Sequence, residues 1–163
     1  EVHVATKLPG RSAEVLVDEG DAVAAGQMLA RMDTASLTAQ LRQAKAQVNE
    51  ARSRRAAGAA GADLRMSECR LSERELGRTR ALHERDFASE RDLDVSRERT
   101  KVAHAACSAA QADVESLEAA IEAAHAQVAR NEADIRDSAL VSPVSGRVQY
   151  RLAEPGEVLA AGR

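Results

Sequence analysis

The side chains that could do chemistry in this sequence are a few cysteines, histidines and lysines, and they are widely scattered. No two of the histidines stand four residues apart, and none has a cysteine at the spacing that zinc ligand pairs use. No serine, cysteine or carboxylate constellation indicates hydrolysis, and no glycine-rich phosphate loop is present. We therefore predict no enzyme activity, no cofactor and no metal site. The histidines, which we expect on the surface, are His3, His83, His104 and His125.

Composition indicates the kind of scaffold that carries these residues. Of 163 residues, 30% are charged and only 1% are aromatic, and the two aromatic residues are Phe87 and Tyr150. Few aromatics among many charged residues and alanines favour long helices packed along a narrow seam over a compact globular core. The net charge of −3 shows no excess of basic residues that could bind phosphates, so we expect no nucleic-acid partner.

The ends of the sequence and its hydropathy bear on the membrane. No run of about 20 apolar residues is present, so no membrane-spanning helix is predicted. The first residue is Glu1 and not methionine, and no signal peptide precedes the first β-like segment. We expect that the sequence was cut from a longer precursor whose membrane anchor, if it has one, lies upstream.

Glycine and proline divide the chain into three zones. Residues 1–33 and 139–163 are rich in turn residues and β-forming stretches, whereas residues 34–138 contain no proline. The outer zones also repeat each other. A shift of 136 residues, from 10 to 146, superimposes three glycines of the first zone on three of the last, and the pairs are Gly10/Gly146, Gly20/Gly156 and Gly26/Gly162. Because glycines in register imply shared turns, we predict that the outer zones are two similar β-units that pair with each other.

The middle zone has the period of a coiled coil. In its second half, apolar or small residues alternate steps of three and four over roughly six heptads, with charged residues elsewhere. The positions of this seam are Leu93, Ser96, Thr100, Ala103, Cys107, Ala110, Val114, Leu117, Ile121, Ala124, Val128, Asn131, Ile135 and Ser138. The first half begins the same way with Leu37, Leu41, Ala44, Val48 and Ala51. Near Gly58 the pattern loosens, and Leu64, Cys69, Leu71, Leu76 and Leu82 indicate a shifted seam there.

Because the outer zones should pair, the helical zone must fold back on itself. The best break in the period is Asp86–Ser89, which predicts an antiparallel hairpin with its tip near 85–90 and arms of roughly 75 Å. Positions whose numbers sum to about 176 then face each other, as Cys69 and Cys107 do. These two cysteines are either a disulfide between the arms or two small buried thiols, and the sequence leaves both open.

The chain resembles the periplasmic adaptor proteins, also called membrane fusion or HlyD-like proteins, of tripartite efflux and type I secretion systems. The segment 15–33 is similar to the first half of that family's lipoyl-like domain, and segments 142–148 and 154–158 are similar to its second half. The resemblance implies an α+β fold in which a helical hairpin (34–138) separates two halves (1–33 and 139–163) of a lipoyl/biotinyl-like β-sandwich.

A second motif lies at the predicted tip. Many efflux adaptors carry Arg-x3-Leu-x6-Ser there, and this chain has Arg78, Leu82 and Ser89 at those spacings. The resemblance implies that Arg78 and Ser89 make polar contacts with a TolC-type outer-membrane channel and that Leu82 makes an apolar one. Ser89 is also well placed as the N-cap of the returning helix. Phe87, a lone aromatic at a turn, is expected either to pack across the tip or to meet a partner.

The resemblance implies a periplasmic connector, tethered to the inner membrane by a segment outside this sequence. Its partners would be a TolC-type channel, an inner-membrane transporter of the ABC, RND or MFS type, and further copies of itself in a ring, commonly of six. The cargo would be small molecules or polypeptides. A lipoyl or biotinyl carrier is disfavoured because no lysine lies at the turn that such carriers modify. The alternative is a free-standing coiled-coil scaffold without a channel partner.

Overall fold

The computed structural model describes residues 2–162 and divides the chain into two compact units. One unit contains the described parts of 1–46 and 125–163, and the other contains residues 47–124. The ends of the two predicted β-segments, residues 1 and 163, lie outside the described residues. None of the helices described is both long enough and apolar enough to cross a membrane.

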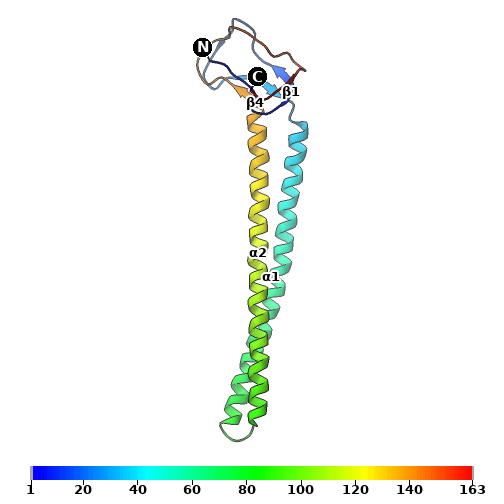
Figure 1. Ribbon diagram of the computed structural model, residues 1–163, viewed down its shortest axis with the longest axis vertical. Coiled ribbons are helices and arrows are strands. Elements are labelled where there is room, and N and C mark those ends of the chain that lie inside the picture. Colours follow the sequence, from blue (N-terminus) through cyan, green and yellow to red (C-terminus); the bar gives the residue numbers. More distant parts are fainter. Residues whose placement is uncertain (1, 163) are drawn as a thin grey trace. The chain divides into compact units, whose positions relative to one another are not determined.

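Two long helices form the middle of the chain. Helix α1 runs over Ala35–His83 and helix α2 over Glu90–Asp137, with residues 84–89 between them. Within 47–124 the helices lie side by side and antiparallel, joined by that short connection (Figure 1). The fold-back predicted near residues 85–90 is therefore present as a helical hairpin.

The predicted seam of α2 is confirmed by burial. Every seam position from Leu93 to Ser138 is buried or half-buried, whereas most positions between them are exposed. The facing rule, by which residues whose numbers sum to about 176 lie opposite each other, holds as well, since Leu117 lies directly against Gly58 on the other helix. Beside the seam, the Arg55 guanidinium pairs with the Glu118 carboxylate at 2.7 Å, in the manner of the flanking charges of a coiled coil.

The predicted shifted seam of α1 is wrong at Leu64, Leu71 and Leu82, but its other two residues, Cys69 and Leu76, do lie on the observed seam. Leu64, Leu71 and Leu82 are exposed, and the seam instead continues in its original register through Gly58, Ala62, Cys69, Ser72, Leu76, Thr79 and His83. The register set from Leu37 onward is kept, although between Ala62 and Cys69 the half-buried residue is Met66 and not Arg65, which is exposed. Burial on a helix is set by angular position, so small and polar residues on the seam are covered while leucines off it remain in solvent.

The two glycines of α1 nearest its midpoint give a matched test of this packing. A Cβ at Gly61 would meet no atom within 4 Å, whereas one at Gly58 would lie 2.6 Å from Leu117 Cδ1. Gly61→Ala should therefore raise the free energy of unfolding by about 0.5–1 kcal/mol, the usual gain in helix propensity. Gly58→Ala should gain less or lose stability, because Leu117 must move. Urea unfolding followed by circular dichroism measures both, and equal gains would contradict the described packing.

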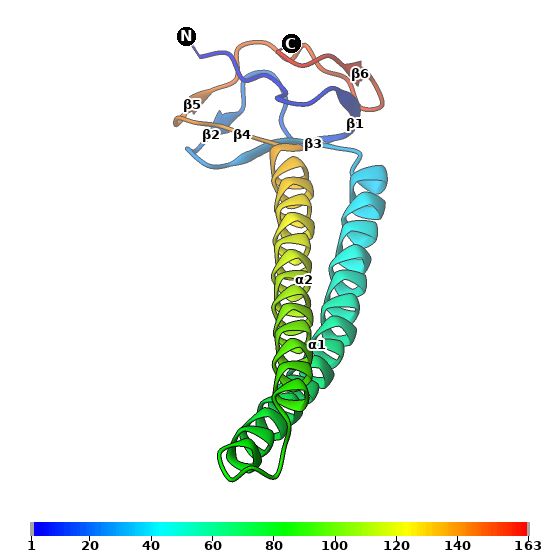
Figure 2. The same cartoon turned by 60° about the horizontal axis from the view of Figure 1, so that its bottom comes forward.

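Strands from the two ends of the chain pair with each other in the β-unit (Figure 2). A four-stranded antiparallel sheet has the order β4-β3-β1-β6, and β2 pairs with β5 in a separate two-stranded ribbon. The strands are β1 (Gly10–Val15), β2 (Ala22–Val23), β3 (Met28–Met32), β4 (Ala139–Val141), β5 (Gly146–Arg147) and β6 (Val158–Leu159). Every strand of the C-terminal segment thus pairs with one from the N-terminal segment.

The hydrogen bonds of the β-unit reproduce the sequence repeat. Gly20 N–H donates to Val148 O and Val148 N–H to Asp21 O. Adding 136 to residue numbers 20 and 21, and subtracting 136 from 148, gives two further bonds. These are Gly156 N–H to Ser12 O and Ser12 N–H to Glu157 O, and both are also present. The two segments therefore exchange equivalent bonds, and the prediction that the outer zones pair is confirmed.

Four of the six repeat glycines have a backbone that requires glycine. Gly20 and its counterpart Gly156 have φ of 93° and 86°, and Gly26 and Gly162 have φ of 81° and 82°. Gly10 and Gly146 instead lie at the starts of β1 and β5 without positive φ. A Cβ on Gly10 would stand 3.1 Å from the methyl carbon of Met32, so close packing accounts for that glycine.

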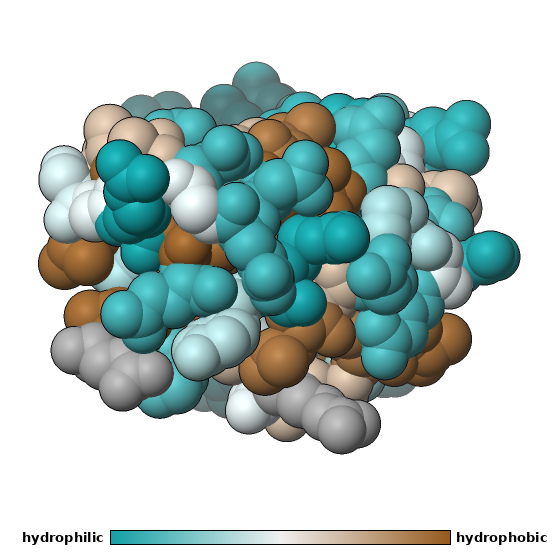
Figure 3. Space-filling view, turned by 90° about the horizontal axis from the view of Figure 1, so that it is seen from above, coloured by the Kyte–Doolittle hydropathy of each residue, from teal (hydrophilic) through white to brown (hydrophobic). Residues whose placement is uncertain are grey.

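The interior of the β-unit is small. Ala30, Met32 and Leu159 are its buried apolar side chains, and the buried Ser12 hydroxyl has no hydrogen-bond partner. Large apolar side chains remain on the outside, and Figure 3 shows hydrophobic residues scattered among hydrophilic ones on the face that it displays. The most exposed of them in this unit are Tyr150, Leu152 and Val158.

Candidate docking site at the hairpin tip

The end of α1 is closed by a C-terminal capping motif that the sequence analysis missed. Asp86 N–H donates to His83 O at 3.0 Å, and Phe87 N–H donates to Leu82 O at 2.9 Å. Asp86 has φ of 62°, the only positive φ among the non-glycine residues described. This pair of bonds around a left-handed residue is a Schellman motif, which satisfies carbonyl groups at the helix end. His83 Nδ1 adds a bond to the Ala88 carbonyl at 2.9 Å, so the connection has a defined conformation.

Ser89 caps the N-terminus of α2, as predicted. Asp92 N–H donates to Ser89 Oγ at 3.2 Å, and Ser89 N–H donates to Asp92 Oδ2 at 3.2 Å. The Ser89 hydroxyl also donates to Asp92 Oδ2 at 2.6 Å. This is a capping box with aspartate in the position where glutamate is usual. A hydroxyl that donates once and accepts once keeps one lone pair for a partner, so capping and docking are compatible at Ser89.

The cap gives a prediction that depends on pH. Hydrogen bonds from the Ser89 side chain and backbone, opposed by desolvation, hold the pKa of the Asp92 carboxyl below its usual value. Because the folded-state pKa is lowered, the stabilisation is complete above the unfolded pKa of about 3.9 and is lost as pH falls through the folded value. Ser89→Ala should therefore cost about 1 kcal/mol at neutral pH and less at acid pH.

Chemical unfolding at two pH values measures this loss. Ser67→Ala is the matched control, because Ser67 lies within α1 and its hydroxyl donates only to the Asp63 carbonyl one turn earlier. That control should lose no cap at either pH. A cost for Ser89→Ala that does not change with pH would contradict the link to Asp92.

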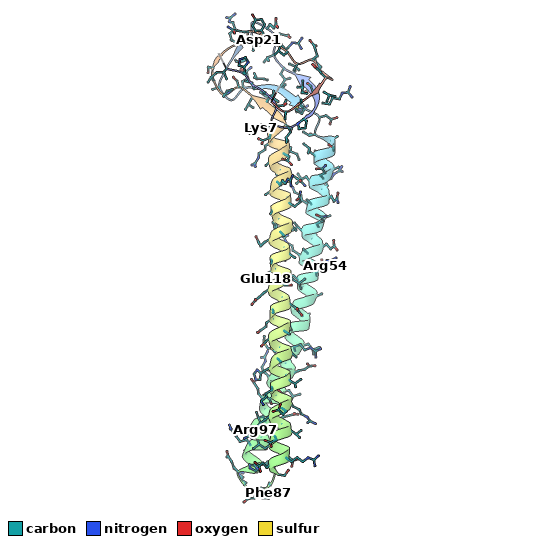
Figure 4. The ribbon with its side chains drawn as sticks, in the orientation of Figure 1. Lys7, Asp21, Arg54, Phe87, Arg97 and Glu118 are labelled. Atoms are coloured by element: carbon teal, nitrogen blue, oxygen red, sulfur yellow. The ribbon has the colours of Figure 1, made fainter. Side chains whose placement is uncertain are left out.

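The three other predicted docking residues are exposed at this tip. Arg78 and Leu82 lie in the last turns of α1. Phe87 lies in the connection, at the end of the hairpin (Figure 4). The Phe87 side chain is 80% exposed and Leu82 is 41% exposed. Phe87 therefore does not pack across the tip, and the first of its two expected placements is not observed. The hairpin ends in an arginine and two apolar side chains that are open to a partner.

The two cysteines lie on the seam further along the hairpin and are free thiols. Cys69 is buried, Cys107 is half-buried, and the two are near enough for Cys107 to contribute to the raised pKa of the Cys69 thiol, so the facing predicted for them is present without a disulfide. Cys69 Sγ also lies 3.4 Å from His104 Nδ1, and His104 Nε2 lies 3.0 Å from Glu73 Oε1. Among the described residues, Cys69, Glu73 and His104 form a group of ligand atoms all within 4.8 Å of one another.

His104 lies on the surface, as expected, but the expectation that no histidine has a cysteine at a ligand spacing is wrong, because Cys107 follows His104 by three positions and Cys69 lies against it. Glu73 follows Cys69 by four positions on α1, and Cys107 follows His104 by three on α2, so each pair shares a helix face. The residue numbers of Cys69 and Cys107 sum to 176, and those of Glu73 and His104 sum to 177. The same rule therefore places Glu73 opposite His104. The sequence rule thus predicts the Glu73–His104 pair as well as the Cys69–Cys107 pair.

The arrangement does not activate the thiol for nucleophilic chemistry. Burial first, then the Glu73 charge and Cys107, raise the pKa of the Cys69 thiol, whereas a reactive cysteine needs a lowered pKa and an accessible sulfur. The surrounding backbone is helical, so its N–H groups are engaged and offer no oxyanion hole. The group is better suited to holding a ligand than to attacking one.

Comparison with known proteins gives matches in structure alone. No family model matches the sequence, and no curated protein matches it. Among solved structures, MacA from Actinobacillus actinomycetemcomitans matches 100% of this chain at a TM-score of 0.75 and 20% identity, over 46% of its own length. The periplasmic adaptor protein EmrA matches 99% of the chain (TM-score 0.57, 17% identity) over 69% of its length. The soluble domain of LipC, a membrane fusion protein of a type I secretion system, matches 98% (TM-score 0.52, 16% identity) over 95%.

The resemblance drawn from the sequence motifs is thus confirmed at the level of the fold. The chain has the fold of the membrane fusion proteins, with a helical hairpin carried by an antiparallel β-unit. It spans less than half of the MacA chain that it matches.

Proposed function

We propose that the chain is the hairpin-bearing part of a periplasmic adaptor that links an inner-membrane transporter to a TolC-type outer-membrane channel. The observation that carries the proposal is the match to MacA over the whole of this chain, with the Arg78, Leu82 and Ser89 pattern at the tip of the same hairpin. In this role the chain binds partners and performs no reaction. The transporter is of the ABC, RND or MFS type, and the cargo is a small molecule or a polypeptide.

The tip is the proposed contact with the channel. Arg78 offers a guanidinium for carboxylates or carbonyls, and the exposed Leu82 and Phe87 offer apolar surface beside it. The Schellman motif and the capping box fix the connection, so little conformational freedom is lost when a partner binds. A rigid end that presents exposed arginine and apolar side chains is suited to insertion between the helices of a partner.

The β-unit is the proposed contact between copies of the adaptor. Its two segments exchange equivalent hydrogen bonds around a repeat, which is the symmetry of a lipoyl-like domain, and we infer that it is one. Tyr150, Leu152 and Val158 give this unit exposed apolar surface that neighbouring copies would cover. A ring of copies, commonly six, held to the inner membrane through a segment outside this sequence, would place the hairpins together in the periplasm.

Photo-crosslinking in cells tests the docking. A photoreactive residue at Phe87 of the full-length adaptor should form adducts with an outer-membrane channel, and Arg78→Asp or Ser89→Arg should reduce them by about tenfold or more. Each of these variants places the wrong charge or a bulky side chain at the contact, and an unpaired or like charge there costs several kcal/mol. Arg54→Asp, on α1 away from the tip (Figure 4), is the control and should leave the adducts unchanged.

Circular dichroism of the purified variants separates lost docking from lost folding. Adducts formed only with further copies of the adaptor or with inner-membrane proteins would overturn tip docking and favour a free-standing scaffold. Adducts that persist in Arg78→Asp and Ser89→Arg would show that these side chains are not the contact.

A further inference from the structure

The cluster between the two arms of the hairpin has the composition of a metal site. It combines a thiol, an imidazole and a carboxylate from two different helices, and a second thiol, that of Cys107, lies nearby on the seam of α2, all within residues 47–124. Thiolate and imidazole ligands together select zinc and similar borderline-soft cations over magnesium or calcium. We propose that Cys69, His104 and Cys107, with Glu73 beside them, form a binding site for a zinc-type divalent cation that links α1 to α2.

The distance between the first two ligand atoms fits such an ion. Cys69 Sγ and His104 Nδ1 are 3.4 Å apart. A tetrahedral zinc with ordinary zinc–sulfur and zinc–nitrogen bonds holds its sulfur and nitrogen ligands about 3.5 Å apart. The two helices therefore already hold the sulfur and the nitrogen at the separation that tetrahedral zinc coordination requires. The thiol proton leaves to solvent when the ion binds, and the ion takes its place between the two atoms.

Glu73 determines which imidazole nitrogen meets the ion. Its carboxylate accepts the Nε2 hydrogen at 3.0 Å, which leaves Nδ1 without a hydrogen and facing Cys69. A histidine ligand commonly donates its other ring N–H to a carboxylate in this way, which fixes the tautomer and the ring. Glu73 is thus a positioning residue, and it also contributes negative charge beside the site.

Cys107 supplies the second sulfur. It is half-buried on the seam of α2 and faces Cys69 across the hairpin, but its sulfur lies outside the group of ligand atoms that are all within 4.8 Å of one another, so its side chain must move to reach the ion. With Cys69 and His104 it gives three ligands, and the fourth position faces solvent, because the side chains of Glu73 and His104 are about half exposed. An ion can therefore enter without opening the hairpin.

Cobalt and zinc titration of the whole chain, reduced and stripped with chelator, tests the site. One equivalent of Co²⁺ should give thiolate-to-cobalt charge-transfer absorption with the intense visible bands of a tetrahedral complex. Zn²⁺ should displace the cobalt and raise the thermal unfolding midpoint. Cys69→Ser and His104→Gln should abolish the cobalt signal, and Cys107→Ser should reduce the charge-transfer intensity by about half, because one of two thiolates is lost.

A matched pair of variants isolates the positioning residue. Glu73→Gln should weaken zinc binding by about 10- to 100-fold, as the loss of such a partner does elsewhere. Glu75→Gln, two residues away on the same helix and exposed, removes the same charge and should change affinity little. Circular dichroism shows whether each variant keeps its helices, so lost binding is not confused with lost folding.

Three results would overturn the proposal. They are the absence of stoichiometric metal binding by the folded, reduced chain, binding that is unchanged in Cys69→Ser and His104→Gln, and a Cys69–Cys107 disulfide in the protein as isolated from cells. The disulfide would appear as a mass lower by two hydrogens and would consume both sulfurs. None of these results bears on docking at the tip, so this site and the adaptor role stand or fall separately.

Discussion

Val48→Asp is expected to abolish the folded hairpin at neutral pH, because it places an unpaired carboxylate in the seam. The Val48 side chain is 5% exposed. A buried charge without a partner costs about 3–5 kcal/mol, which is a large part of the stability of an ordinary domain. Chemical unfolding followed by the helical circular dichroism signal measures the loss.

Two companion variants separate charge from volume. Val102→Asp makes the same change on α2 at a side chain that is 69% exposed, and it should alter stability by about 0.5 kcal/mol at most. Val48→Ala removes volume without adding charge and should cost about 2 kcal/mol. The difference between the two Val48 variants then gives the cost of the charge.

The pH dependence of Val48→Asp has a definite sign. Burial raises the pKa of the introduced carboxyl in the folded state, so the folded chain holds its proton to higher pH than the unfolded chain does. The destabilisation should therefore grow as pH rises through the unfolded pKa of about 3.9 and reach its full value above the folded pKa. A Val48→Asp protein as stable as Val102→Asp at neutral pH would show that this seam is not buried.

Leu93→Ala is expected to destabilise the tip by about 2–4 kcal/mol, whereas Leu82→Ala should cost less than about 1 kcal/mol. Both leucines lie within the turns nearest the connection, yet Leu93 is 5% exposed and Leu82 is 41% exposed. The first truncation leaves a cavity in the seam, and the second removes atoms that are already partly in water.

The same pair divides folding from docking. Leu82→Ala should keep the helical signal of the parent protein while lowering photo-adducts with the channel. Leu93→Ala should lower both, the adducts because the tip that carries Phe87 and Ser89 is less often formed. If Leu82→Ala lost as much stability as Leu93→Ala, Leu82 would be a packing residue, and its assignment to docking would fail.

Periodicity was a sound guide to the helices and leucine content was not. The steps of three and four from Leu93 to Ser138 identify the buried face of α2 at every position, because angular position on a helix decides which residues face its neighbour. On α1 the apolar character of Leu64 and Leu71 predicted a shift of seam that is absent. Had spacing been weighted above residue type there, the seam through Ala62 and Ser72 would have been found.

The tip was predicted only in part. The Ser89 cap follows from a local pattern, a serine before a helix with an acidic residue three positions later, and such patterns are legible in sequence. The left-handed Asp86 was missed, because glycine is the usual residue at that position and aspartate gives a weak signal. Whether Phe87 packs or points outward depends on the surrounding surface, which a linear sequence does not display.

By itself, the sequence determined the helical hairpin, its turning region and the pairing of two repeated β-segments, because heptad periods and glycines in register act through local geometry. Only the tertiary structure decided how β1 to β6 pair and that Cys69 Sγ lies 3.4 Å from His104 Nδ1, because the facing rule alone pairs Cys69 with Cys107. Those contacts join residues distant in the chain, so a shift of one helical position between α1 and α2 would separate them. Their formation depends on the register that the packed seam sets.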